Sequence, residues 1–442
     1  MQDIKEEKTL SIPSFSEALR FWFKLGWISF GGTTGHIAIM HDFLVEKKKW
    51  ISEKRFMYAL NACMLLPGPE GQQLAIYAGW KLHGIKGGIL SGVLFVLPSL
   101  LILLLLSIIY ALYGNNPVMM SMFAGLKPAV LAIILHATWK VGKKALHGML
   151  HYLVAMASFV LSYFMNVPMP WIILGVILFA IGMHLTAPGA IQLDKKKEVA
   201  DVAEQSYYIN MNQQAHPVIK RVLVKQLLCF LVLWLIPFLL LSVVTADPAF
   251  WQRLSTLFTK TAFFTIGGSY TVIPYVANMM VNQLSWLSKT QMIDGFALAE
   301  TTPGPLVIVL VYTGFMAAYN HFGGSLLMGT LGLLATGYFT FLPNFLFIFV
   351  GAPLIESSQK SRIIQAVLSL ITATVVGVIV NLAFYLGKDI LFSGQAVSLS
   401  HTDWMALGWV LIALLLLTRY RLNVLYLVLI SLAFGAFRYI IT

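Results

Sequence analysis

The stretch LLPGPEGQQLA, residues 65–75, interrupts a segment that is otherwise apolar. A proline inside a helix removes a backbone hydrogen bond and clashes with the preceding turn, so no regular helix passes through Pro67-Gly68-Pro69. A carboxylate, Glu70, follows directly. The same turn recurs in TTPGPLVIVLV, residues 301–311. An apolar segment is therefore broken in the same way twice, which predicts that the breaks serve the function of the protein.

Composition places the chain in the membrane. Hydrophobic residues make up 58% of its 442 residues and charged residues 11%, with a mean hydropathy of +0.80. Such values are typical of polytopic membrane proteins. Residues 1–15 lack the apolar centre of a cleavable signal, so we expect the first hydrophobic segments to direct insertion. Cys63 and Cys229 lie in apolar runs and are expected to be small core residues rather than disulfide or metal ligands.

The net charge of +12 is carried largely by lysines and arginines in short loops between apolar runs. That pattern is typical of topological charge in membrane proteins, so no nucleic-acid partner is expected. The motifs GxxxxGK[ST], HExxH, GxSxG and nucleotide-type GxGxxG do not occur. The sequence therefore predicts neither an enzyme nor a bound cofactor or metal.

A shift of 236 residues aligns the sequence with itself at several rare residue types. The pairs are Lys24 with Lys260, Gly31-Gly32 with Gly267-Gly268, Trp50 with Trp286, Ser52 with Ser288, Pro67-Gly68-Pro69 with Pro303-Gly304-Pro305, and Gly87-Gly88 with Gly323-Gly324. This register predicts two copies of one structural unit, residues 1–186 and 250–442. Residues 187–249 join them through a polar linker and one unmatched apolar segment, 222–246. Beyond Gly324 the register drifts, since Leu97-Pro98 needs a larger offset to meet Leu342-Pro343.

Each copy is expected to contain two broken helical segments followed by four continuous ones. In the first copy these are 15–40, broken at the glycine pair, 56–79, broken at Pro-Gly-Pro, and then 87–113, 117–138, 149–165 and 170–185. In the second copy they are 251–281, 292–319, 323–352, 363–386, 402–417 and 422–441. The predicted fold is an all-α polytopic membrane protein with two repeats joined by one extra transmembrane helix.

Loop charge favours a topology in which both broken segments of each copy enter and leave the membrane on one side. Loops rich in Lys and Arg, such as 47–55, then share the cytoplasmic side with the N-terminus, and the loops at 115–116 and 320–322 lie outside. Threading each broken segment straight across is the alternative, but it places 47–55 outside. With an even number of crossings per copy, the extra span inverts the second copy. Inverted repeats with broken helices are typical of secondary transporters.

Breaks in a membrane helix persist only beside ligand, water or other protein, because unpaired backbone groups are costly in hydrocarbon. A half-helix N-terminus with free N–H groups can hold an oxyanion, and glycine lets the backbone approach it closely. The candidate binding residues follow the glycine pairs and surround the Pro-Gly-Pro turns: Gly31, Gly32, Thr33, Thr34, His36, Gly68, Gln72, Gln73, Gly267, Gly268, Ser269, Tyr270, Thr271, Thr301, Thr302 and Gly304. The alternative use of the glycine pairs is close helix packing.

Glu70 and Glu300 flank the two Pro-Gly-Pro turns, one after the first and one before the second. A carboxylate deep in a bilayer is usually protonated, paired or beside water, which makes both residues candidates for carrying a coupling proton. The alternative is a loop carboxylate at the membrane interface. Lys24 and Lys260 are candidates for long-range attraction of an anion, with snorkelling of the ammonium groups to the lipid headgroups as the alternative.

These candidates lie in long ordered motifs. The motifs are GWISFGG, KKKWISEKRFMYALNACMLLPGPEGQQLAIYAGW, FFTIGGSYTVIPYVA, DGFALAETTPGPLVIVL and TFLPNFLFIFVGAP. The chain resembles the chromate ion transporter family, in its long two-domain form, over nearly its whole length apart from the linker. The family's first glycine motif usually continues with proline, where this chain has Thr33.

The resemblance implies export of the oxyanion chromate across a bacterial cytoplasmic (inner) membrane, with sulfate as a structural analogue and the proton gradient as the energy source. Together with the broken helices it suggests alternating access around one midplane site, with protons carried by Glu300 and Glu70. An uncoupled carrier or channel and an integral membrane chromate reductase are the alternatives. A homodimer is compatible with the sequence.

Overall fold

The computed structural model describes residues 13–30, 32–186, 191, 207–210, 220–245, 247–265, 272–353, 362–392 and 398–441. These residues form helices, apart from their turns and one isolated β-bridge between Ile51 and Ile209. Six of the helices are long and apolar enough to cross a membrane, and four shorter ones are apolar as well. The chain is an all-α polytopic membrane protein, as its composition predicts.

The first half is broken where proline and glycine predict. Its helices are α1 (Phe15–Ile28), α2 (Gly32–His41), η1 (Asp42–Lys47), α3 (Glu53–Leu65), α4 (Glu70–Tyr113), α5 (Pro117–Ala145), α6 (Met149–Tyr163) and α7 (Met169–Thr186). The glycine pair separates α1 from α2, and the Pro-Gly-Pro turn separates α3 from α4. Within α4 the helical backbone is interrupted at His83 and Gly84, where Gly84 has a φ of 63°.

The second half follows helix α8 (Lys220–Val244). Its helices are α9 (Pro248–Phe264), α10 (Ile273–Ala277), η4 (Asn278–Gln283), α11 (Lys289–Glu300), η5 (Leu306–Ile308), α12 (Val309–His321), α13 (Leu326–Leu346), η6 (Phe347–Gly351), α15 (Arg362–Phe392), η7 (Leu399–His401), α16 (Trp404–Thr418) and α17 (Val424–Ile441). The second Pro-Gly-Pro turn separates α11 from η5 and α12.

Matching local structures recur at the 236-residue offset. Helices η4 and α11 begin at this distance after η1 and α3. Ser52 and Ser288 cap α3 and α11 by accepting a backbone N–H three residues later, at 3.2 and 3.1 Å. Three residues before each cap, Lys49 and Ser285 have positive φ values of 53° and 50°. The repeated sequence thus specifies repeated turns as well as repeated helices.

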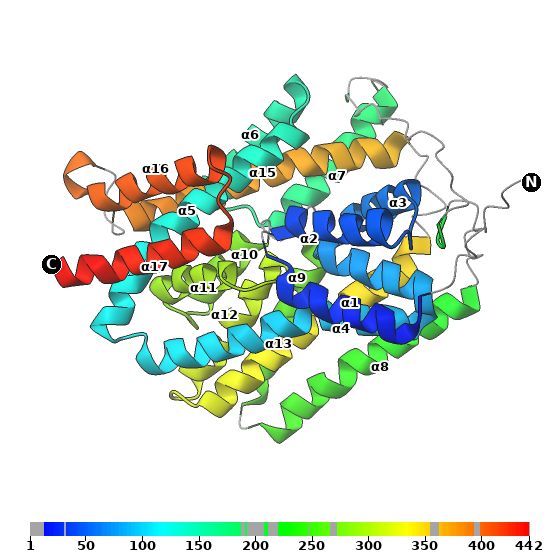
Figure 1. Ribbon diagram of the computed structural model, residues 1–442, viewed down its shortest axis with the longest axis horizontal. Coiled ribbons are helices and arrows are strands. Elements are labelled where there is room, and N and C mark those ends of the chain that lie inside the picture. Colours follow the sequence, from blue (N-terminus) through cyan, green and yellow to red (C-terminus); the bar gives the residue numbers. More distant parts are fainter. Residues whose placement is uncertain are drawn as a thin grey trace, which may run out of the picture.

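Helices of the first half pack directly against several helices of the second half, so the two halves form one bundle. Helix α5 of the first half packs against α15, α16 and α17 of the second, and α4 packs against α12 and α13 (Figure 1). The α5–α17 contact is close because Gly125 and Gly435 face each other, so that a Cβ on Gly125 would lie 2.5 Å from the Gly435 nitrogen. Small residues permit such an approach between membrane helices.

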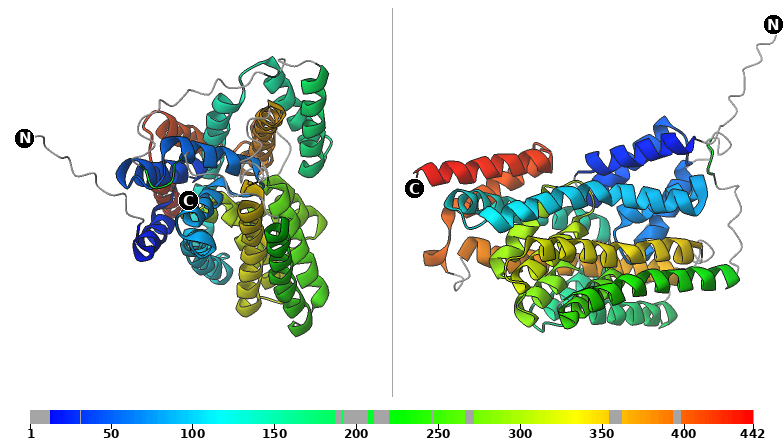
Figure 2. Two further views of the ribbon diagram at one scale, coloured as in Figure 1. Left: turned by 90° about the vertical axis from the view of Figure 1, so that its right-hand side faces the viewer. Right: turned by 90° about the horizontal axis from the view of Figure 1, so that it is seen from below.

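Helix α8 lies at the edge of the bundle (Figure 2). It packs on α9 and α13 and exposes apolar side chains such as Leu228 and Leu231, a surface suited to lipid. Cys229, predicted to be a core residue, is exposed on this helix, so that prediction is wrong. An apolar run in a membrane protein can face lipid as well as protein. Cys63 on α3 is buried, as predicted.

Part of the connecting segment lies against the basic loop of the first half. Ile209 N–H donates to the Trp50 carbonyl at 2.9 Å, and Ser52 N–H donates to the Ile209 carbonyl at 2.8 Å. Ile209 is fully buried. Residues 207–210 and the loop at residues 47–55 therefore lie at the same end of the bundle.

Candidate functional site

The two Pro-Gly-Pro turns meet the ends of α1 and α9 through a reciprocal pair of backbone hydrogen bonds. Gly68 N–H donates to the Thr265 carbonyl at 2.6 Å, and Gly304 N–H donates to the Ser29 carbonyl at 2.7 Å. Ser29 and Thr265 are the residues that end α1 and α9. Each turn thus pairs with the broken helix of the other half, and the breaks of both halves lie together in the structure.

Both turn glycines are required by conformation and by space. Gly68 and Gly304 have φ values of 116° and 96°, a region that residues with side chains rarely adopt. A Cβ on Gly68 would collide with Asn344 Oδ1, and one on Gly304 would collide with Ser99 Oγ. Each turn is therefore closely contacted by a polar side chain from the opposite half.

Asn344 and Ser99 hold these turns through side-chain hydrogen bonds. Ser99 Oγ donates to the Pro303 carbonyl, and Asn344 Nδ2 donates to Gln72 Oε1 at 2.7 Å. Both side chains are fully buried, and each follows a proline inside its helix. Neither residue was predicted to belong to the site. A second register, with an offset of 245 residues, aligns Leu97-Pro98-Ser99 with Leu342-Pro343-Asn344 and would have identified them.

His36 is bonded to the same carbonyl as Gly304. Its Nε2 lies 2.8 Å from the Ser29 oxygen, which can only accept, so Nε2 carries a proton. The ring is buried, and Nδ1 has no hydrogen-bond partner among the described residues. The first half therefore places an imidazole with one unbonded ring nitrogen beside the break. The aligned residue of the second half is Val272.

The predicted glutamines and threonines surround the turns, but several of their polar atoms are already bonded. Gln73 Nε2 donates to the Pro67 carbonyl, and Gln72 Nε2 donates to the Gly92 carbonyl at 3.3 Å. The hydroxyls of Thr301 and Thr302 donate to carbonyls of α11, at 2.6 and 2.8 Å. A hydroxyl has one proton, so in this conformation these threonines can accept a hydrogen bond from a ligand but cannot donate one.

The two predicted carboxylates stand at different helix ends: one directly follows the first turn, and the other precedes the second turn. Glu70 is the first residue of α4, is 6% exposed, and its Oε2 has no hydrogen-bond partner among the described residues. Glu300 is the last residue of α11 and is partly buried. Lys24 and Lys260 are exposed on α1 and α9, away from the buried faces of these helices.

Several predicted site residues fall outside the described part of the chain. These are Gly31, Gly267, Gly268, Ser269, Tyr270 and Thr271. Gly32, Thr33 and Thr34 form the first turn of α2, where Gly32 has a φ of 68°, but the two threonine side chains are not described.

A second polar cluster joins the halves away from the turns. Asp294 on α11 lies 3.1 Å from Lys127 Nζ and accepts a hydrogen bond from the Tyr110 hydroxyl at 2.8 Å. Its side chain is 5% exposed, and the buried Tyr312 ring packs against the Tyr110 ring. Sequence reasoning missed this cluster. Asp294 and Lys127, charged residues inside apolar segments, were the available signal.

Known proteins related to this chain identify its family. The sequence profile of a family described as chromate transporter matches the chain twice, at residues 16–183 and 252–436. No solved structure matches the chain.

Three curated relatives cover most of the chain. A probable chromate transport protein of Synechococcus elongatus is 28% identical over 85% of both chains. A chromate transport protein of Cupriavidus metallidurans is 27% identical over 84% of this chain and 82% of its own. An uncharacterized transporter of Methanocaldococcus jannaschii is 26% identical over 96% of this chain and 94% of its own. The chain therefore belongs to the chromate transporter family.

Proposed function

We propose that this protein is a secondary active transporter that exports chromate from the cytoplasm through one site between its two halves, in exchange for protons. The reciprocal pairing of Gly68 with Thr265 and of Gly304 with Ser29 carries the proposal. It brings the breaks of both halves to a single place, as a site between repeats requires. Chromate is proposed as the substrate because two of the relatives are named as chromate transport proteins.

The repeats are proposed to be inverted, with the broken segments entering and leaving on the same side. The contact between Ile209 and the loop at 47–55 favours this topology, because straight threading would place that loop and the connecting segment on opposite sides of the membrane. Helix α8 then provides the single extra crossing that turns the second half over. By the distribution of basic loops, the N-terminus is cytoplasmic in a bacterial inner membrane.

Oxyanion binding is proposed to use neutral donors. Helices α4 and η5 begin directly after the two turns, and α2 begins within the glycine pair, so their first N–H groups lack partners within their own helices. Such groups favour an anion without a lysine at the membrane centre. Because chromate and sulfate share charge and tetrahedral shape, donors of this kind are expected to accept sulfate as an analogue.

Proton coupling is assigned to Glu70 and Glu300. Glu70 is almost completely buried, and its Oε2 is unpartnered among the described residues, so its charged form is poorly supported where it lies. Alternation between a protonated and an ionised carboxyl beside the anion site would couple the two movements. For exchange, the site would carry chromate while the carboxyls are ionised and return empty while they are protonated, so that chromate and protons cross in opposite directions.

The test is chromate flux into liposomes that contain the purified protein. Vesicles that are acidic inside are expected to accumulate chromate above its external concentration, and a protonophore is expected to abolish that accumulation. Flux that ignores the pH gradient would instead indicate an uncoupled carrier or channel. Appearance of chromium in a lower oxidation state would indicate a reductase.

A further inference from the structure

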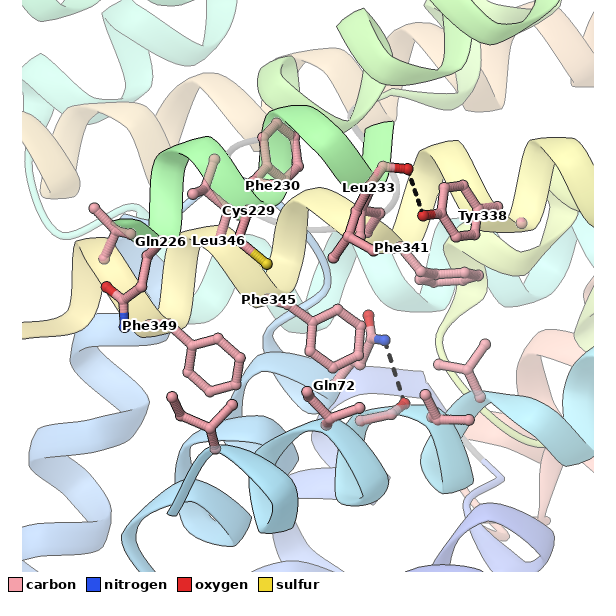
Figure 3. A pocket seen from close by; sticks show the side chains of 18 of the residues that line it. Gln72, Gln226, Cys229, Phe230, Leu233, Tyr338, Phe341, Phe345, Leu346 and Phe349 are labelled. Carbon is pink, nitrogen blue, oxygen red and sulfur yellow. Dashed lines mark hydrogen bonds between the residues drawn. The ribbon is translucent and has the colours of Figure 1, made fainter. Parts of the chain in front are cut away.

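An apolar crevice of about 720 Å³ is lined by residues of α8, α4 and α13. Figure 3 shows its walls, with the Cys229 sulfur of α8 pointing towards Phe345 of α13, and Phe349 of η6 further along the same wall. The α4 wall is formed by Ile85, Ile89 and Val93, which lie on one helical face and are 51%, 44% and 44% exposed. None of the described residues that line the crevice carries a carboxylate. An opening of this composition between membrane helices suits a hydrocarbon chain and not an oxyanion.

The length of the crevice matches one leaflet of a bilayer. Its α8 wall runs from Val222 to Leu233, about 16 Å at the helical rise of 1.5 Å per residue. Half of a bilayer's hydrocarbon core is about 15 Å thick. At Leu233 the two walls are joined, because the Tyr338 hydroxyl of α13 donates to the Leu233 carbonyl of α8 at 2.7 Å (Figure 3).

The opposite end of the crevice is positively charged. Lys225 lines it, and Arg221 lies one helical turn earlier on α8, where both side chains are exposed. Beside Lys225, the buried Oε1 of Gln226 has no hydrogen-bond partner among the described residues. Basic residues at the cytoplasmic end of a cleft between membrane helices recognise anionic lipid headgroups.

We propose that this crevice binds one anionic phospholipid, with its phosphate at Arg221 and Lys225 and one acyl chain between α8, α4 and α13. Gln72 lines the crevice and accepts the hydrogen bond of Asn344, the residue that contacts the first Pro-Gly-Pro turn. The bound acyl chain therefore contacts Gln72, which is hydrogen-bonded to the side chain that contacts the first turn. The inference does not depend on what the protein transports.

The first test uses native mass spectrometry of the purified full chain with phosphatidylglycerol or phosphatidylcholine of identical acyl chains. We expect one phosphatidylglycerol to be retained in preference to phosphatidylcholine. Lys225→Ala is expected to lower the apparent affinity for phosphatidylglycerol about fivefold, as one basic residue near an anionic surface does. Arg253→Ala, which removes an exposed arginine outside the crevice, is the control. Equal retention of both lipids would overturn the headgroup assignment.

The acyl-chain position has a separate test. Cys229→Trp places an indole in the crevice between α8 and α13 and is expected to weaken retention strongly, whereas Leu231→Trp places the same bulk on an exposed position of α8 outside it. In the unmodified protein, Cys229 is the exposed cysteine and Cys63 is buried. A maleimide is therefore expected to label Cys229 more slowly as phosphatidylglycerol is added. Labelling at an unchanged rate, with equal lipid retention by both tryptophan variants, would overturn the proposal.

Discussion

The two Pro-Gly-Pro turns have the same backbone but different polar surroundings. Gly68 and Gly304 share a positive φ and the same reciprocal bond to the opposite half. The first turn is followed by Glu70 and two buried glutamines, whereas the second is followed by the apolar residues of η5 and preceded by Glu300. The backbone conformation of the turn thus occurs in both halves, whereas neither carboxylate has a carboxylate at the aligned position of the other half.

This difference separates what the repeat provides from what each half adds. Both turns supply a helix start and a glycine that permits close approach. Only the first half adds His36, and the contacts on the glycines come from Ser99 in one case and Asn344 in the other. Two copies of one unit can therefore form a single site whose two sides carry different chemistry.

The largest expected effect is on transport, and it concerns the two carboxylates. We expect Glu300→Gln and Glu70→Gln each to reduce accumulation driven by a pH gradient to the level of empty vesicles, because glutamine cannot release a proton. Exchange of internal for external chromate is expected to continue in both variants. Flux of labelled chromate measures both properties. Glu46→Gln, at a position 63% exposed, is the control, and unchanged gradient-driven accumulation in both site variants would remove the proton role.

The next effect is on stability, and it compares the two side chains that hold the turns. Asn344→Ala leaves the buried Gln72 Oε1 without its donor and is expected to cost about 1–3 kcal/mol. Ser99→Ala removes one hydrogen bond to the Pro303 carbonyl and is expected to cost about 1 kcal/mol. Chemical unfolding in detergent measures both. Thr330→Ala, whose hydroxyl bonds only a carbonyl of its own helix, is the control, and a cost no greater than that control would contradict the holding role.

A smaller effect is expected at the helix caps, where the halves are most alike. Ser52→Ala and Ser288→Ala each remove the acceptor for the first turn of the following helix, and each is expected to cost about 1 kcal/mol. The same unfolding measurement applies. If one variant were neutral and the other destabilising, the structural equivalence of α3 and α11 would not extend to their stability.

The smallest effect distinguishes the starts of α1 and α9. Ser14 caps α1, while Asp247, which lies outside the helices long enough to span a membrane, caps α9. A hydrogen bond from His321, and then one from the Phe250 N–H, hold the pKa of Asp247 below its ordinary value of 3.8. A lowered carboxyl pKa stabilises the folded state above the unfolded pKa, and this contribution is lost as pH falls through the folded pKa. Melting temperatures of the wild type and Asp247→Asn are therefore expected to differ less at pH 3 than at pH 6, and a constant difference would contradict this.

Proline and glycine chemistry made the breaks predictable from the sequence. A helix cannot cross Pro67-Gly68-Pro69, and one offset relates both turns, so the positions of the breaks and the all-α membrane fold followed directly. Gln72, Gln73, Thr301 and Thr302 lie beside the turns, although the hydroxyl protons of Thr301 and Thr302 are bonded within α11.

Contacts between distant helices were not predictable in this way. Ser99 and Asn344 lie beyond the point where the 236-residue register fails, and the pairing of Lys127 with Asp294 depends on how α5 and α11 pack. Periodicity shows that a segment is apolar but not whether it faces protein or lipid, which is why Cys229 was misplaced. These features depend on how helices of the two halves pack against each other.

The most direct test of a single shared site is the initial rate of chromate flux for Gly68→Ala, Gly304→Ala and the double variant. Gly175→Ala is the control, because a Cβ there has no neighbour within 4 Å. If both halves form one site, each single variant alone abolishes flux and the double variant loses nothing further. If each turn instead served its own pathway, each single variant would keep about half of the flux and only the double variant would lose it all.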